Sequence, residues 1–100
     1  QVVRDAVQLM QTECQTRGRL DLWNIFRMRV VDPMLHDAEP VDYSELVQRF
    51  GCETPRQMIN LLVNAKRCFT KHLRSAVAKY INDESEIDEE IADLRRIVMR

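Results

Sequence analysis

Glycine and proline are scarce in this chain, which holds two glycines and three prolines in 100 residues. There is no glycine-rich phosphate loop, and apolar residues recur at helical spacing, without the period-two runs that predict strands. The three cysteines, Cys14, Cys52 and Cys68, are odd in number and widely spaced, which excludes a disulfide framework and favours a reducing cytoplasm. No apolar stretch is long enough to cross a bilayer, so we expect no membrane contact.

The chain does hold a helical alternation of apolar and charged side chains along its whole length. We therefore predict a single all-α domain over residues 1–100, a bundle of about five helices. The apolar stripe of the first helix recurs at spacings of four and three residues, at Val3, Val7, Met10 and Cys14. Because the chain starts at Gln1 inside this helix, without a Met, we expect it to be a fragment of a longer protein.

The most apolar segment follows Gly18 and predicts the second helix. Asp21 is placed to cap its start, and Pro33 is placed to end it, because a proline disfavours helical geometry at the residue before it. An acidic loop comes next, over residues 33–40. The apolar side chains of this helix predict the centre of the core: Trp23, Ile25, Phe26, Val30 and Val31.

A short polar helix, a glycine turn and a long basic helix occupy residues 42–80, which is the arrangement of a helix-turn-helix. Asp42 and Glu45 have the spacing of a capping box at the start of the short helix. Gly51 supplies the left-handed residue that commonly ends a helix.

The long helix begins at a second capping box, formed by Thr54 and Gln57, and nothing breaks its pattern until about Asn82. At about 100° per residue, its polar side chains gather within an arc of roughly 80°, so we expect one face to be wholly polar or basic. The opposite face is an apolar stripe of Met58, Leu62, Ala65, Phe69, His72 and Ala76. The residues predicted to contact DNA are Arg56, Gln57, Asn60, Asn64, Arg67, Lys71 and Arg74.

Such a helix has the chemistry that a DNA groove requires. Arginine and lysine neutralise phosphates, and arginine and amide side chains make bidentate contacts with guanine and adenine. Base contacts in helix-turn-helix proteins come from the first part of the helix, so the four residues from Arg56 to Asn64 are predicted near base edges. The later three, from Arg67 to Arg74, are predicted on phosphates or on another acidic surface. The exposed face of an ordinary helical bundle would have a similar composition.

The net charge of −1 conceals an asymmetry along the chain. Residues 43–80 hold seven basic and two acidic side chains, whereas residues 81–100 hold three basic and seven acidic ones. A basic middle of this kind favours contact with nucleic acid. The acidic end predicts a terminal helix over residues 84–100, with an apolar stripe of Ile87, Ile91, Leu94 and Val98.

At this point the residues resemble a known family. The run Tyr43-Ser-Glu-Leu, then Gly51, then Asn60-Leu-Leu-Val-Asn-Ala-Lys-Arg, is similar to the C-terminal promoter-binding region of bacterial sigma factors of the extracytoplasmic-function type. The resemblance covers roughly residues 20 to 75. It implies a recognition helix in the major groove of the upstream promoter element and contact with core RNA polymerase. Carried over by position, the groove-facing set is Arg56, Gln57, Asn60, Asn64 and Arg67.

Catalysis and metal binding are not predicted. Cys68 and His72 lie four residues apart on one helix face, but two ligands are too few, and both fall near the apolar stripe, so we expect them to pack in the core. No Ser-His-Asp or Cys-His arrangement has a familiar context, so we expect neither an enzyme nor a cofactor.

Several alternatives stay open at this stage. The domain is either a DNA-binding domain of a sigma-like factor in the bacterial cytoplasm, or a helical protein-interaction module that has the same shape and does not bind DNA. The terminal helix folds back on the first and fourth helices, or it forms a homodimer with a second copy. Its acidic side chains could also lie over the basic face and weaken DNA binding.

Overall fold

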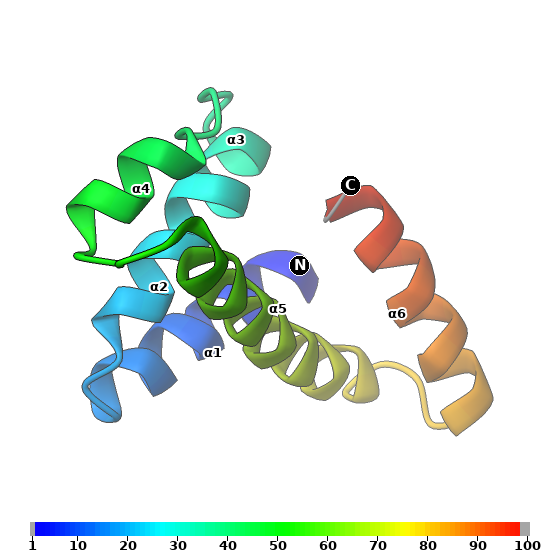
Figure 1. Cartoon of the computed structure of the whole chain (residues 1–100). Coiled ribbons are helices and arrows are strands. Elements are labelled where there is room, and N and C mark those ends of the chain that lie inside the picture. The colour runs from blue at the N-terminus through cyan, green and yellow to red at the C-terminus, as the bar shows by residue number, and fades with distance from the viewer. Residues whose placement is uncertain (1, 99–100) are drawn as a thin grey trace.

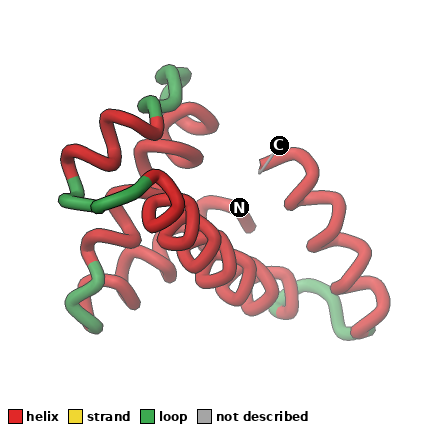
Figure 2. The backbone as a smooth tube through the Cα atoms, in the orientation of Figure 1, coloured by secondary structure: helices red, strands yellow, loops and turns green. Residues whose placement is uncertain are grey.

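The computed structural model describes residues 2–98, in which every element of regular structure is helical (Figure 2). The helices are α1 (Val2–Thr16), α2 (Leu20–Phe26), a π-helical segment η1 (Arg27–Val31), α3 (Asp32–Leu35), α4 (Tyr43–Arg49), α5 (Pro55–Ala78) and α6 (Glu84–Val98). Since α2, η1 and α3 follow one another without a break, the chain forms five continuous helical segments (Figure 1). The predicted all-α bundle of about five helices is confirmed.

The second helix passes through Pro33, so the prediction that it ends there was wrong. Asp32 keeps helical angles, with φ −63° and ψ −44°, and Pro33 stands in the first turn of α3, where a missing N–H is tolerated. The wider turns of η1 precede it, and two adjacent residues of this segment, Val30 and Val31, are both buried. The helix ends one turn later, before Asp37, which has a φ of +53°.

The start of α2 also differs from the prediction. The helix begins two residues earlier than a cap at Asp21 implies, at Leu20, and Arg19 is its N-cap residue. Asp21 therefore lies inside the first turn, where its carboxylate accepts hydrogen bonds of 3.1 and 3.2 Å from the Arg19 guanidinium. A carboxylate in the first turn is still favourable to the helix dipole, although it does not cap the helix.

The core lies where α5 packs on α1 and α2. Every residue of the predicted centre is buried, and Phe26 faces Phe69 with 5.0 Å between ring centroids. α5 contributes most of its apolar stripe to the core, with Met58, Leu62, Ala65, Phe69 and Ala76 buried and His72 half-buried. α1 adds the buried side chains of Val7, Met10 and Cys14.

The short helix α4 packs on the first half of α5 through a second cluster of Ile25, Leu46, Met58 and Leu62. Gly51 ends α4 with a φ of +66°, as predicted. Asp42 is the N-cap residue, but its side chain forms no capping bond, and Glu45 instead pairs with Arg49 at 2.9 Å. The predicted capping box of α4 was therefore wrong, because the i,i+4 ion pair takes the Glu45 carboxylate.

The capping box of α5 is confirmed in part. Thr54 accepts a hydrogen bond of 3.3 Å from the backbone N–H of Gln57. The Gln57 side chain reaches back to the N–H of Glu53 at 2.7 Å, one residue before the position that a standard box would use.

The terminal helix α6 folds back on its own chain. After the turn that follows α5, it lies beside the second half of α5 (Figure 1). Ile87 and Ile91 are buried in one cluster with Val77, against which Leu94 and Val2, at the start of α1, also pack. Met99 and Arg100, which the prediction included in this helix, lie outside the described residues.

None of the helices within residues 2–98 combines the length and the apolar character needed to cross a membrane.

Candidate nucleic-acid interface

The side of α5 that faces away from the core is open to solvent. The helix is 24 residues long, and its buried side chains recur at spacings of three and four, which leaves the opposite face outward. All seven predicted contact residues are exposed: Arg56, Gln57, Asn60, Asn64, Arg67, Lys71 and Arg74. We refer to these residues as the α5 strip.

The first half of the strip carries free polar groups. Within residues 2–98, neither Arg56 nor Arg67 forms an ion pair. Asn60 and Asn64 stand between them on successive turns. This part of the strip presents two cations and two amides to any ligand that approaches.

Gln57 also caps the start of α5. Its side-chain oxygen accepts the hydrogen bond from Glu53 that caps α5, which leaves the amide nitrogen and one lone pair of the oxygen for a ligand. The capping bond also restricts the directions in which this side chain can reach a base.

The second half of the strip is already paired. Lys71 lies 2.5 Å from a carboxylate oxygen of Glu13 on α1, and Arg74 lies 2.6 Å from Asp88 on α6. Their side chains remain about half exposed, at 56% and 49%, and exposed ion pairs of this kind are weak. These two residues can contact a phosphate only by exchanging their present partners.

The outward face is not wholly polar, contrary to the prediction. Ile59 and Val63 are 48% and 41% exposed along the edge of the strip. Helical geometry places Val63 only roughly 20° from Arg56, so it lies among the cations. The surface therefore combines cationic side chains with an exposed apolar edge.

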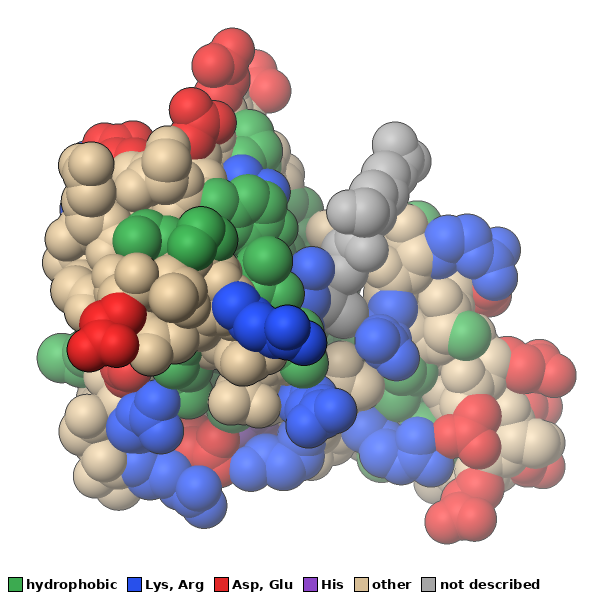
Figure 3. Space-filling view, in the orientation of Figure 1, with side chains coloured by type: hydrophobic (Ala, Val, Ile, Leu, Met, Phe, Trp, Pro, Cys, Tyr) green, Lys and Arg blue, Asp and Glu red, His purple; other side chains and the backbone are tan. Residues whose placement is uncertain are grey.

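The sequence analysis missed a group of cations beside the strip. α6 brings Arg95 next to Lys66 and Arg67, around a groove of about 410 Å³ that is also lined by Val63 and Thr70. A neighbouring hollow of about 390 Å³ is lined by Lys66, Ala92, Arg95 and Arg96. Figure 3 shows lysine and arginine side chains gathered along α5 and on the side of α6 that faces it. We call the residues Lys66, Arg67, Arg95 and Arg96 the cationic groove.

The acidic side chains of α6 leave the first half of the strip uncovered. Among the described residues, Asp88 alone on α6 forms an ion pair with the strip, through Arg74. Apart from Asp88, the acidic side chains of α6 that Figure 3 shows lie on its outer side, away from α5. One arrangement considered from the sequence, in which the acidic helix covers Arg56 to Arg67, is not found within residues 2–98.

Cys68 packs against the edge of the core, in line with the prediction, and the side chain of His72 is only 14% exposed. Both are half-buried and face Glu13 of α1, and donor atoms of the three side chains lie within 4.8 Å of one another. The sequence analysis missed Glu13, because it is 55 residues from Cys68 along the chain.

Comparisons with family models, with curated proteins and with solved structures return no match to this chain. The resemblance to sigma factors therefore stays a prediction.

Proposed function

We propose that this chain is a DNA-binding domain of a sigma-like transcription initiation factor. The observation that supports the proposal is the exposed α5 strip, in which Arg56, Asn60, Asn64 and Arg67 follow one another on one face of a long helix. The helix is braced from behind by α1, α2 and α4, so its outward face can enter a major groove as a rigid rod.

The residues divide the work between bases and phosphates. Arg56, Asn60 and Asn64 lie on the first three turns of α5, the part of a recognition helix that contacts base edges. Lys66 and Arg67 lie further along α5, and Arg95 and Arg96 lie beside them on α6. These residues of the cationic groove would bind the phosphates that border the major groove of the DNA. Like charges gathered at one place repel one another, and an anionic backbone would relieve that repulsion.

The test is charge reversal on the strip. We expect Arg56→Glu combined with Arg67→Glu to lower the affinity for a random-sequence DNA duplex by about 100-fold at low salt. The dependence of log affinity on log salt should also become shallower by about two. Fluorescence anisotropy with labelled duplex at several salt concentrations measures both quantities.

The matched control has the same change in net charge. Arg4→Glu with Lys79→Glu alters two exposed cations outside the strip, on α1 and just after α5. Equal losses in the two double variants would show that only net charge matters, and absence of binding by the unaltered chain at low salt would refute the proposal.

A second candidate function is supported by the apolar edge of the strip. Exposed aliphatic side chains beside cations are typical of a surface that binds another protein, and Ile59 and Val63 form such an edge. On this reading the domain is a helical interaction module, and its partner carries an acidic rim; core RNA polymerase is the partner that the resemblance implies.

One variant distinguishes DNA binding from protein binding. Ile59→Ser with Val63→Ser keeps every charge, so duplex affinity should stay within about two-fold of that of the unaltered chain if DNA is the ligand. Binding to core RNA polymerase, measured in parallel, should weaken if the apolar edge is a protein-binding surface.

A homodimer through the terminal helices stays a prediction. Ile87 and Ile91 are buried against the same chain, whereas Ile97 is 65% exposed. A dimer would therefore have to use the end of α6, and sedimentation of Ile97→Ser beside the unaltered chain would test it.

A further inference from the structure

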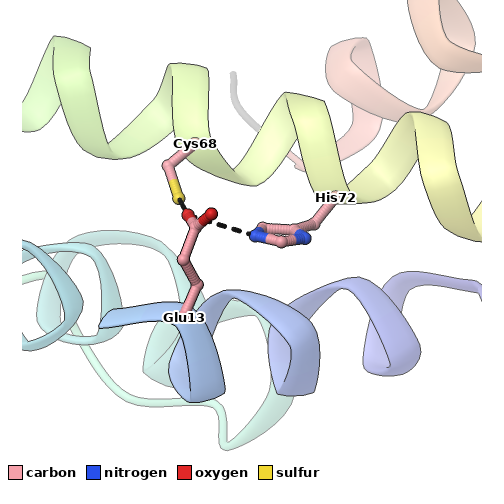
Figure 4. A group of neighbouring side chains, drawn as sticks. All are labelled: Glu13, Cys68 and His72. Carbon is pink, nitrogen blue, oxygen red and sulfur yellow. Dashed lines mark hydrogen bonds and ion pairs between the residues drawn. The ribbon is translucent and has the colours of Figure 1, made fainter. Parts of the chain in front are cut away.

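Three side chains with different donor atoms meet where α1 crosses α5 (Figure 4). The thiol of Cys68 donates a hydrogen bond to Glu13 Oε2 at 2.9 Å, and His72 Nε2 lies 3.3 Å from the same oxygen. Cys68 and His72 share a face of α5 because they are four residues apart. The sulfur of Cys68 and the ring nitrogen of His72 therefore both lie close to one carboxylate oxygen of Glu13.

The hydrogen bonds among these groups are incomplete. His72 Nε2 is buried and has no hydrogen-bond partner of acceptable geometry, although the Glu13 oxygen is near. The imidazole as a whole is only 14% exposed, so water does not replace the missing bond easily. The buried Nε2 of His72 therefore has a lone pair or a proton that no hydrogen bond uses, and a bound ligand would satisfy it.

A cysteine nucleophile does not explain the cluster. In such a site the histidine would accept the thiol proton, whereas here the carboxylate lies between Cys68 and His72. Burial and the neighbouring Glu13 carboxylate raise the pKa of the Cys68 thiol to about 12, so the reactive thiolate is scarce.

We propose that Glu13, Cys68 and His72 bind a divalent transition-metal ion, with zinc as the ion that the donor set fits. Zinc takes thiolate, imidazole and carboxylate ligands at about 2.0–2.3 Å, and ligand atoms that all lie within 4.8 Å of one another can surround one ion after small side-chain rotations. An adjoining pocket of about 180 Å³, lined in part by Glu13, Cys68 and Lys71, leaves room for water as a fourth ligand.

The charges of the site balance when the metal enters. The Cys68 thiol gives up its proton to solvent as the metal–sulfur bond forms, and thiolate and carboxylate together neutralise the divalent ion. The Lys71 ammonium, 2.5 Å from Glu13 Oε1, then competes with the metal for the carboxylate. Lys71 is therefore an antagonist of metal binding, a role that an ordinary surface ion pair would not have.

Cobalt and zinc titrations of the whole chain test the proposal. Cobalt(II) should give the charge-transfer absorption of a cobalt–thiolate bond, and zinc should abolish it by displacement. Cys68→Ser, His72→Gln and Glu13→Gln should each weaken zinc binding by more than about 100-fold. Cys52→Ser and His36→Gln are the matched controls, since each removes the same donor type elsewhere on the chain, and both should bind as the unaltered chain does.

Lys71→Met provides a test of opposite sign. It removes the competing ammonium and leaves all three ligands, so zinc affinity should rise by about 10-fold. Absence of the cobalt–thiolate band in the unaltered chain, or its survival in Cys68→Ser, overturns the proposal. If circular dichroism shows that a ligand variant does not fold, the unaltered chain and Lys71→Met alone test the proposal. A lower zinc affinity in Lys71→Met also contradicts the proposal.

Discussion

Glu13 is the residue through which α1 and α5 make their polar contacts. Its carboxylate lies near Lys71, Cys68 and His72 of α5, and near Arg17 of its own helix at 3.9 Å. The hydrogen bond from Cys68, followed by that from Lys71, lowers the pKa of Glu13 from 4.5 to about 2. The ionised carboxylate of Glu13 is therefore more stable, relative to the protonated form, in the folded chain than in the unfolded chain.

A pH-dependent loss of stability is expected for Glu13→Gln in the presence of a chelator. Because the folded pKa is depressed, the stabilisation by Glu13 is complete above pH 4.5 and is lost as the pH falls toward about 2. The variant should be less stable by about 1–2 kcal/mol at pH 7 and nearly equal to the unaltered chain near pH 2.

Urea unfolding at a series of pH values measures this difference. Glu39→Gln, in the exposed loop before α4, is the control and should leave the stability within about 0.5 kcal/mol at every pH. A deficit in Glu13→Gln that does not change with pH would mean that packing, and not charge, is responsible.

At the level of elements, α5 organises the molecule by its two faces. One face contributes buried side chains to every part of the core, and the other carries the α5 strip. The division follows from the helical period of the sequence, which is why much of each face could be predicted. The buried Leu73 and Val77 and the exposed Ile59 and Val63 were not predicted.

Substitutions on the two faces of α5 should differ sharply in their effect on stability. Phe69→Ala removes a fully buried ring from the contact with Phe26 and should cost about 3–5 kcal/mol. Ile59→Ala, on the exposed edge of the same helix, should change the stability by less than about 0.5 kcal/mol. Urea unfolding compares the two, and losses of similar size would contradict the assignment of the faces.

The features that the sequence did not predict depend on contacts between elements. The second helix passes through Pro33 directly after the wide turns of η1, where Val30 and Val31 are buried and Arg27 pairs with Asp32 at 2.9 Å. The approach of Glu13 to Cys68 depends on how α1 crosses α5. Neither contact leaves a periodic signal along the chain, whereas the apolar stripes do.

At the scale of the whole molecule, α6 carries acidic side chains near its start and arginine side chains near its end. In its first turns Glu84 and Glu89 are exposed and Asp88 pairs with Arg74 of α5. Near its end, Arg95 lines the groove beside α5. The overall acidity of residues 81–100 is therefore a poor guide to what α6 presents to the strip. Folding brings a cationic end of an acidic helix to a basic helix, and the result is the cationic groove.

The cationic groove leads to the last prediction, which depends on the proposed DNA-binding function. If α6 assists binding, Arg95→Gln with Arg96→Gln should weaken duplex affinity by about 10-fold and make its salt dependence shallower by up to about two. Glu84→Gln with Glu89→Gln, on exposed acidic positions of the same helix, should change the affinity by less than about three-fold, since long-range repulsion between solvent-exposed charges is screened. If α6 instead inhibits binding, the arginine variant should have little effect and the glutamate variant should tighten binding; anisotropy titrations of both variants at two salt concentrations distinguish these outcomes.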